Sequence, residues 1–380
     1  MRVVKLIIDN PKYTTEYFSL KERAFVDPTQ KISKSLFTSQ SFAAHLQNEI
    51  CIPIHPNEYQ PVLPDIYPVP ARTKWSFEDG SFTKLKKNIK LSEGLTFESC
   101  LKNTKRLLKA TKGKIAIEIS GGLDSSIMIG MLESLGYEPI LVGTFSDLYK
   151  FRTEKHIQET IAKKFKNVIL SKSFSLQFTN LLETPPHFLP SYTSLHHNIA
   201  ANTIQLLKEH DVKYVFQGVA FDAMLVEAVN NNANDIRWPT LQDNWLHDYV
   251  HAPQGSAYID IAALSPVKQV LLSLRNGQAE DRQKWWARKF FTSVIPPELS
   301  NYAYKANFGP LWWDGLLSSS DQITEIVDTA WQITALPIFE NFQMQSLFDG
   351  MNNGAGRTGF ALLGYANWVH SLHKADRLID

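Results

Sequence analysis

The chain is poor in cysteine, in long apolar runs and in excess charge of either sign. Its 380 residues include two cysteines, Cys51 and Cys100, too few for a disulfide framework or a cysteine-rich zinc site. No apolar stretch approaches the roughly 20 residues that span a bilayer, and the N-terminus has no secretory core. A formal net charge of +1 argues against a broad nucleic-acid surface. We therefore expect a cytoplasmic protein that binds neither nucleic acid nor a membrane.

Apolar runs and helical patterns alternate through the middle of the chain. The runs are short and rich in branched side chains, which is typical of buried strands, and apolar residues at helical spacing separate them. Such alternation predicts an α/β fold with a doubly wound, mainly parallel sheet whose ligand crevice lies at the carboxyl ends of the strands. From about residue 235 the chain is expected to be mostly helical. The expected strands occupy residues 114–119, 139–145, 168–170 and 212–216.

The first part of the chain has a different pattern. Six prolines from Pro53 to Pro70 separate short strand-like pieces, and no long helix is evident. We therefore expect two domains, a shortened β-rich N-terminal domain over residues 1–90 and a larger one over residues 91–380.

The segment Ser120-Gly121-Gly122-Leu123-Asp124-Ser125-Ser126 connects an expected strand to an expected helix. A strand that turns into a helix through glycines brings free backbone N–H groups together at the helix N-terminus, where phosphate binds. The serines add hydroxyl donors. Asp124 would repel a phosphate unless a divalent cation lay between them, so we expect Asp124 to be a Mg²⁺ ligand. The alternative is a glycine-rich turn without a ligand.

The loop is not a Walker A loop, because no glycine is followed after four residues by Gly-Lys-Ser/Thr, and γ-phosphoryl transfer is not favoured. It resembles the pyrophosphate-binding loop of the ATP pyrophosphatase (PP-loop) superfamily, and within it the synthetase domain of the asparagine synthetase family. That family includes β-lactam synthetases and lasso-peptide cyclases. The resemblance implies a PP-loop (adenine nucleotide α-hydrolase-like) fold and an ATP-dependent ligase. Such a ligase adenylates a carboxylate, releases pyrophosphate and passes the acyl group to an amine.

The resemblance also implies roles for single residues in nucleotide binding. The cofactor-binding set that it implies is Ser120, Gly121, Gly122, Leu123, Asp124, Ser125, Ser126, Thr144 and Gly218. Asp222 matches an aspartate that shares the Mg²⁺ with Asp124, and it could equally cap a helix.

Lys305 matches the catalytic lysine of the family, which with Asp124 and Asp222 completes the expected catalytic set. A lysine aimed at the α-phosphate and the developing oxyanion would stabilise charge in both half-reactions. The alternative is a solvated surface lysine, with Arg288 and Lys289 as the other candidate cations.

Two positions depart from the family pattern. Amide-forming members usually carry an acidic, histidine or tyrosine side chain at position 219, and Val219 cannot transfer a proton. Either another group deprotonates the amine, with His196 and His197 as candidates, or the site has degenerated. In addition, Arg2 stands where a glutaminase domain would carry its nucleophilic cysteine, so glutamine is not expected to supply the amine.

Together these features predict an AMP-forming carbon–nitrogen ligase that uses ATP and Mg²⁺ to close a lactam or macrolactam ring in a peptide or small metabolite. The expected partner is a peptide or small-molecule carboxylate, and a protein that delivers a precursor peptide is a further hypothesis. Three alternatives stay open: a degenerate synthetase that binds nucleotide or peptide without catalysis, an ammonia-dependent amide synthetase, and a PP-loop enzyme acting on another nucleophile. The lack of a cysteine pair near the loop and of a basic face counts against the last.

Overall fold

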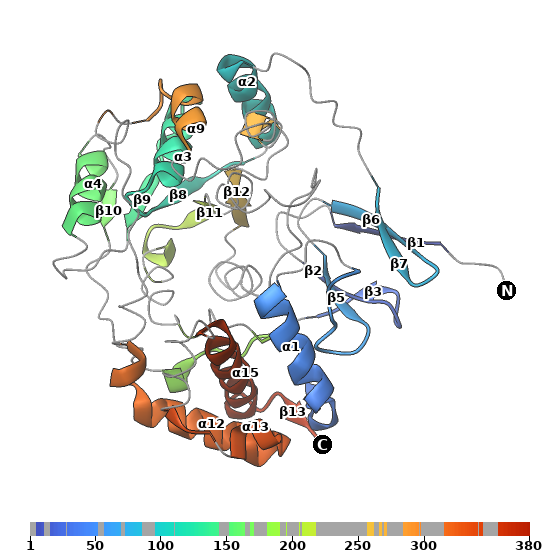
Figure 1. Cartoon of the computed structure of the whole chain (residues 1–380). Coiled ribbons are helices and arrows are strands. Elements are labelled where there is room, and N and C mark those ends of the chain that lie inside the picture. Colours follow the sequence, from blue (N-terminus) through green and yellow to red (C-terminus); the bar gives the residue numbers. More distant parts are fainter. Residues whose placement is uncertain are drawn as a thin grey trace.

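The computed structural model describes most parts of the chain, with gaps between them (Figure 1). The described residues are 5–10, 16–27, 29–51, 57–69, 73–85, 96–109, 111–143, 152–163, 168–170, 181–190, 195, 205, 207–217, 257–261, 266–267, 270–271, 284–295, 297, 315–340, 342–344 and 356–380.

A five-stranded parallel sheet forms the middle of the fold, in the order β10-β9-β8-β11-β12. This confirms the expected α/β class with a parallel sheet. Four of the strands are those that the sequence predicts, within two residues at each end. The strands are β8 (Lys114–Ile119), β9 (Ile140–Gly143), β10 (Val168–Leu170), β11 (Val212–Gln217) and β12 (Ala257–Asp260).

Both faces of the central strand β8 are buried, as its run of branched side chains predicts. Ile115, Ile117 and Ile119 belong to a hydrophobic cluster with the inward face of the following helix, whereas Ala116 belongs to a second cluster with Val142 and Val215. The first cluster also holds the helices on that side of the sheet. They are α2 (Phe97–Leu108), α3 (Leu123–Ser134), α4 (Arg152–Ala162) and α9 (Trp285–Phe290).

The fifth strand is one that the sequence pattern did not predict, although most of the described residues after residue 235 lie in helices, as expected. Residues 257–260 form β12, which pairs in parallel with β11 through Val215↔Tyr258 and Gln217↔Asp260. The strand is only four residues long and has a single β-branched side chain, Ile259. Its conformation is set by pairing with β11 rather than by a local pattern.

The N-terminal region contains two small antiparallel sheets and one parallel strand pair. The sheets have the orders β1-β6-β7 and β3-β2-β5, and the C-terminal strand β13 pairs with β4. The elements are β1 (Leu6–Asn10), β2 (Glu16–Ser19), β3 (Ala24–Phe25), β4 (Ile32–Ser33), the 3₁₀ turn η1 (Lys34–Leu36), β5 (Ile66–Val69), β6 (Thr73–Glu78), β7 (Ser81–Lys84) and β13 (Leu378–Ile379).

The expectation of no long helix in this region is wrong, because α1 occupies Ser39–Cys51. Thr38 and Ser41 begin the helix with reciprocal bonds: each backbone N–H donates to the other's hydroxyl, at 3.0 and 3.1 Å. The helix buries polar side chains such as His45 and Asn48 beside Phe42, so its apolar periodicity is weak. That is why the sequence pattern did not indicate it.

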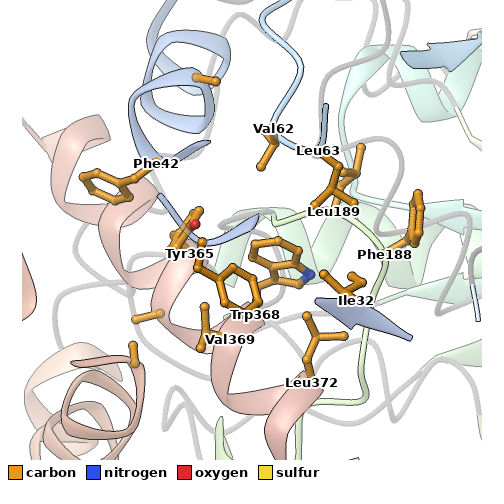
Figure 2. Close-up of a cluster of buried hydrophobic side chains, with 14 of the residues drawn as sticks. Ile32, Phe42, Val62, Leu63, Phe188, Leu189, Tyr365, Trp368, Val369 and Leu372 are labelled. Carbon is orange, nitrogen blue, oxygen red and sulfur yellow. The ribbon is translucent and has the colours of Figure 1, made fainter. Parts of the chain in front are cut away.

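The N-terminal region shares one hydrophobic core with the C-terminal helices (Figure 2). Trp368 lies at its centre with no exposed surface, and its indole N–H donates to the carbonyl of His187 at 2.8 Å. Phe42 and Val62 come to this core from the N-terminal region, and Tyr365 from the last helix. The division into residues 1–90 and 91–380 stays a prediction. The further elements are η3 (Leu181–Glu183), α12 (Ser320–Thr334), α13 (Pro337–Glu340) and α15 (Gly356–Lys374).

Among the described residues, no helix is both long enough and apolar enough to cross a membrane.

The shared core contains two histidines that are buried in neutral form. The His45 ring N–H donates to the carbonyl of Ala361 at 2.8 Å and its other ring nitrogen is buried without a hydrogen bond, so burial lowers the pKa of His45 to about 4. Burial likewise lowers the pKa of His187 to about 3.

We expect the fold to lose stability below the ordinary histidine pKa of 6.5. The unfolded chain binds protons there that the folded chain excludes, so the free energy of unfolding falls as the pH falls. For His45 the loss reaches about 3 kcal/mol near pH 4, at about 1.4 kcal/mol per pH unit. Urea unfolding between pH 7.5 and pH 4.5 should show a shallower pH dependence for His45→Gln than for the wild type. Exposed His373→Gln is the control, and equal slopes in all three proteins would contradict the expectation.

Candidate functional site

The predicted phosphate loop is a tight turn between β8 and α3. Gly121 has φ +76°, in the region that favours glycine, and Gly122 occupies the N-cap of α3 in an extended conformation. Gly122 has no side chain to cap the helix, so the cap residue itself does not compete with an incoming anion for the first-turn N–H groups. Leu123 is half-buried and packs against the hydrophobic cluster that contains Ile117 and Ile119 of β8.

Serine hydroxyls hold the loop in shape. The Ser125 hydroxyl lies 3.2 Å from that of Ser120 and donates to the carbonyl of Gly122 at 3.1 Å. The Ser126 hydroxyl donates to the same carbonyl at 2.8 Å, and the Gly122 N–H donates to the Ser120 hydroxyl at 3.3 Å. The loop's own side chains therefore stabilise its conformation, which lowers the ordering cost of binding a ligand.

The loop lies at the point where the strand order of the sheet reverses. The chain runs from β8 to β9 and β10 on one side, and later adds β11 and β12 on the other side of β8. In open parallel sheets, ligands bind beyond the carboxyl ends of the strands at such a switch point. The loop directly follows the carboxyl end of β8, so its position fits a ligand-binding role.

Asp124, in the first turn of α3, forms a close ion pair with Lys284. The Lys284 ammonium lies 2.8 Å from Asp124 Oδ1 and 2.6 Å from Oδ2, so one nitrogen bridges both carboxylate oxygens. The side chains are 9% and 21% exposed for Lys284 and Asp124, which leaves the pair only partly accessible to water. An ion pair at this depth is stronger than a surface pair, because solvent screens it less.

Lys284 is the residue that sequence reasoning missed. It immediately precedes α9 and has φ +57°, a left-handed conformation that is uncommon for lysine. Its partner lies 160 positions earlier in the chain, and no local pattern pairs the two. Its only sequence signal is its place beside the run of candidate cations, Arg288 and Lys289, which the structure places in α9.

Trp285 and Arg288 lie in α9, the helix that Lys284 precedes. The Arg288 guanidinium lies 5.3 Å from the centre of the Trp285 ring, in a cation–π contact. Arg288 is 9% exposed, whereas Trp285 is 43% exposed. Residues 284–288 thus hold two buried cations and one exposed aromatic ring, and Lys284 contacts Asp124 of the loop.

The structure brings together the expected residues of the loop, Ser120 through Ser126, and adds Lys284 to them. The remaining expected site residues lie outside the described residues. They are Thr144, Gly218, Asp222 and Lys305, together with Val219, His196 and His197.

The residues present fit a Mg²⁺ ion that is held jointly with phosphate. Asp124 already binds a cationic group, the ammonium of Lys284, with both oxygens. Among the residues that the structure describes, no group of three or more acidic, histidine or cysteine side chains forms a metal cage. Mg²⁺ in phosphate sites is usually held by one or two carboxylates, phosphate oxygens and water, so a single described carboxylate is compatible with it.

Neither a protein-family model nor a curated protein matches this chain. The family resemblance therefore depends on the sequence itself, above all on residues 120–126.

Proposed function

We propose that this protein is an ATP-dependent, AMP-forming ligase that joins a carboxylate to an amine. One observation carries the proposal: Asp124 of the Ser-Gly-Gly-Leu-Asp-Ser-Ser loop meets a buried lysine at the switch point of a parallel sheet. A loop of this sequence, placed at a helix N-terminus, is suited to pyrophosphate, and a doubly wound PP-loop arrangement of the sheet is part of the proposal.

In the first half-reaction, the loop binds the β- and γ-phosphates of ATP through its N–H groups and the hydroxyls of Ser120 and Ser125. A substrate carboxylate oxygen attacks the α-phosphorus, the bond to the bridging oxygen breaks, and pyrophosphate leaves with the electron pair. Mg²⁺ held by Asp124 and Asp222 would neutralise charge on the leaving pyrophosphate. Lys284, which now pairs with Asp124, would be a further cation for the phosphate oxygens if Asp124 held Mg²⁺.

In the second half-reaction, an amine nitrogen attacks the acyl carbon, and AMP leaves with the electrons of the broken carbon–oxygen bond. The nitrogen gives up a proton to a base, for which His196 and His197 are the candidates. Lys305 stabilises the developing oxyanion, while Thr144 and Gly218 hold the adenine, in the roles that the family resemblance implies. In this proposal the amine belongs to the substrate itself, so that the product is a lactam or macrolactam of a peptide or small metabolite.

A second candidate function is nucleotide or peptide binding without chemistry. Val219 favours it, since valine cannot deprotonate an amine at the position where family members usually carry a polar side chain. The two functions differ in whether ATP is converted to AMP.

The test is an analysis of nucleotide products from Mg²⁺-ATP with a panel of carboxylates, including peptides that contain aspartate or glutamate. Each carboxylate is assayed with and without ammonia. Asp124→Ala runs beside the wild type, and Glu133→Ala, an exposed change on the same helix, is the matched control.

The proposal expects AMP and pyrophosphate from the wild type and from Glu133→Ala, and neither product from Asp124→Ala. Turnover that depends on added ammonia would favour the ammonia-dependent synthetase over ring closure. ADP and phosphate would overturn the proposal, and tight ATP binding without any turnover would favour the second candidate.

A further inference from the structure

Helix α3 touches the segment after α9 through a glycine that leaves no room for a side chain. A Cβ built on Gly130 would lie 2.6 Å from Val294 Cβ and 2.9 Å from the Val294 carbonyl carbon, and closer still to the carbonyl oxygen. Real carbon atoms do not approach backbone so closely. The backbones of the helix and of Val294 can therefore meet only because residue 130 is glycine.

Val294 is linked to Lys284 by backbone hydrogen bonds and by the peptide bond between Ala287 and Arg288. The Val294 N–H donates to the carbonyl of Phe291 at 2.9 Å, and the Phe291 N–H donates to that of Ala287 at 2.9 Å. The Arg288 N–H donates to the carbonyl of Lys284 at 3.0 Å. Residues 284–295 thus form one short, continuous unit.

The unit is fixed on its other side by aromatic packing. The Phe97 ring lies 6.1 Å from that of Phe290 and 5.9 Å from that of Phe291, both edge-on. Phe291 and Ala287 are fully buried in the cluster that also contains Met131 of α3. The unit is therefore held between α2 and α3, and a shift at Val294 is passed on to Lys284.

We infer that Gly130 is a positioning residue of the candidate site: it sets the distance at which α3 holds the 284–295 unit, and so places the Lys284 ammonium on Asp124. A role of Gly130 in catalysis rests on the proposed function, but the contact between Gly130 and Val294 can be tested independently of that function. Helix α3 makes both contacts, since Asp124 lies in its first turn and Gly130 lies six residues further along.

An alanine at position 130 would push the unit away from α3. To restore an ordinary van der Waals distance between the new Cβ and Val294, residues 284–295 must move by about 1 Å, because a close-packed interior has no space for an added methyl group. The 2.6 and 2.8 Å contacts between Lys284 and Asp124 cannot survive such a movement unchanged. Alanine is also the better helix former, so local propensity would oppose any loss of helix.

The experiment measures how fast acetic anhydride modifies Lys284, by mass spectrometry of the full-length protein after digestion. Exposed Lys289, in the same helix, is the internal reference. In the wild type, Lys284 should react about 10-fold more slowly than Lys289, because it is buried and ion-paired. Gly130→Ala should raise the rate at which Lys284 is modified about 10-fold and leave the rate for Lys289 unchanged.

Gly136→Ala is the matched control. Gly136 has φ +82°, and a Cβ there meets nothing within 4 Å, so alanine strains the backbone without pushing on Val294. Its Lys284 rate should equal that of the wild type. A protected Lys284 in folded Gly130→Ala, or equal acceleration in both variants, would overturn the inference.

A second measurement covers the case in which Gly130→Ala does not fold. The wild type is titrated with urea. The concentration at which Lys284 becomes reactive should equal the concentration at which the amides of Val294 and Ile295 begin to exchange. If Lys284 reacts at urea concentrations at which those amides remain protected, the contact at Gly130 does not position it. Lysine modification needs no turnover, so a failure of the proposed ligase activity would be seen separately, in the nucleotide products.

Discussion

Asp124→Asn is expected to lower the rate of pyrophosphate release by about 10³-fold or more. The substitution keeps the size of the side chain and its ability to accept a hydrogen bond from Lys284. It removes the negative charge that would hold Mg²⁺ against the phosphates, and a neutral amide is a poor ligand for that ion. The measurement is the carboxylate-dependent exchange of labelled pyrophosphate into ATP.

Two comparisons give this result its meaning. Glu133→Gln removes one negative charge from the exposed side of the same helix, and its exchange rate should stay within about twofold of the wild type. Thermal unfolding of Asp124→Asn tells whether the Lys284 ammonium, left without its anion, also weakens the fold. A folded Asp124→Asn protein with undiminished exchange would exclude the proposed role of Asp124.

Trp368→Ala is expected to lower the free energy of unfolding by about 4 kcal/mol. The indole is fully buried and lies edge-on to Phe37 and Tyr365, with ring centres 5.3 Å apart in both pairs. Alanine would leave a cavity there, and the carbonyl of His187 would lose the donor that it now has at 2.8 Å. Urea unfolding measures the loss.

Trp368→Phe separates packing from hydrogen bonding in that prediction. It retains most of the buried surface and should cost about 1 to 3 kcal/mol, mainly for the unpaired carbonyl. Trp285→Ala, at a side chain that is 43% exposed, is the control and should cost about 1 kcal/mol or less. Hydrogen exchange of Trp368→Ala should accelerate in α1 and β5 but not in β8, because β8 belongs to a different cluster. Equal acceleration of hydrogen exchange in α1, β5 and β8 would mean that the core around Trp368 and the core around β8 unfold together.

The sequence predicted the strands of the parallel sheet well where each strand is marked by its own apolar pattern. β8 and β10 occupy the expected residues, and β11 extends one residue beyond its expected end, because each strand is a short apolar run in the sequence. The prediction failed where the local pattern is weak or where the conformation depends on residues far away in the sequence. The helix α1 buries His45 and Asn48, which break its apolar pattern, and β12 depends on pairing with β11.

The candidate site shows the same division. The loop could be predicted because strand, glycine turn and helix are contiguous, and its serine network involves residues at most five apart. Lys284 could not, since an ion pair between positions 124 and 284 is created by the packing of α3 against residues 284–295. A lysine and an aspartate so far apart have no periodicity in common.

The core around Trp368 has a consequence for the order in which the chain folds during synthesis. Residues near the start, such as Ile32 and Phe42, have their packing partners on α15, and β4 has its strand partner at Leu378–Ile379. At about 5 to 20 residues per second, a ribosome needs about 15 to 60 s to travel from residue 84 to residue 372. Throughout that interval the nascent N-terminal segment presents uncovered apolar strands, whereas β8 and α3 can assemble with β9 as soon as they emerge. The segment that contains β1 to β7 is thus synthesised before β8 and α3 but completed after them, and we expect it to depend more than they do on chaperones during translation.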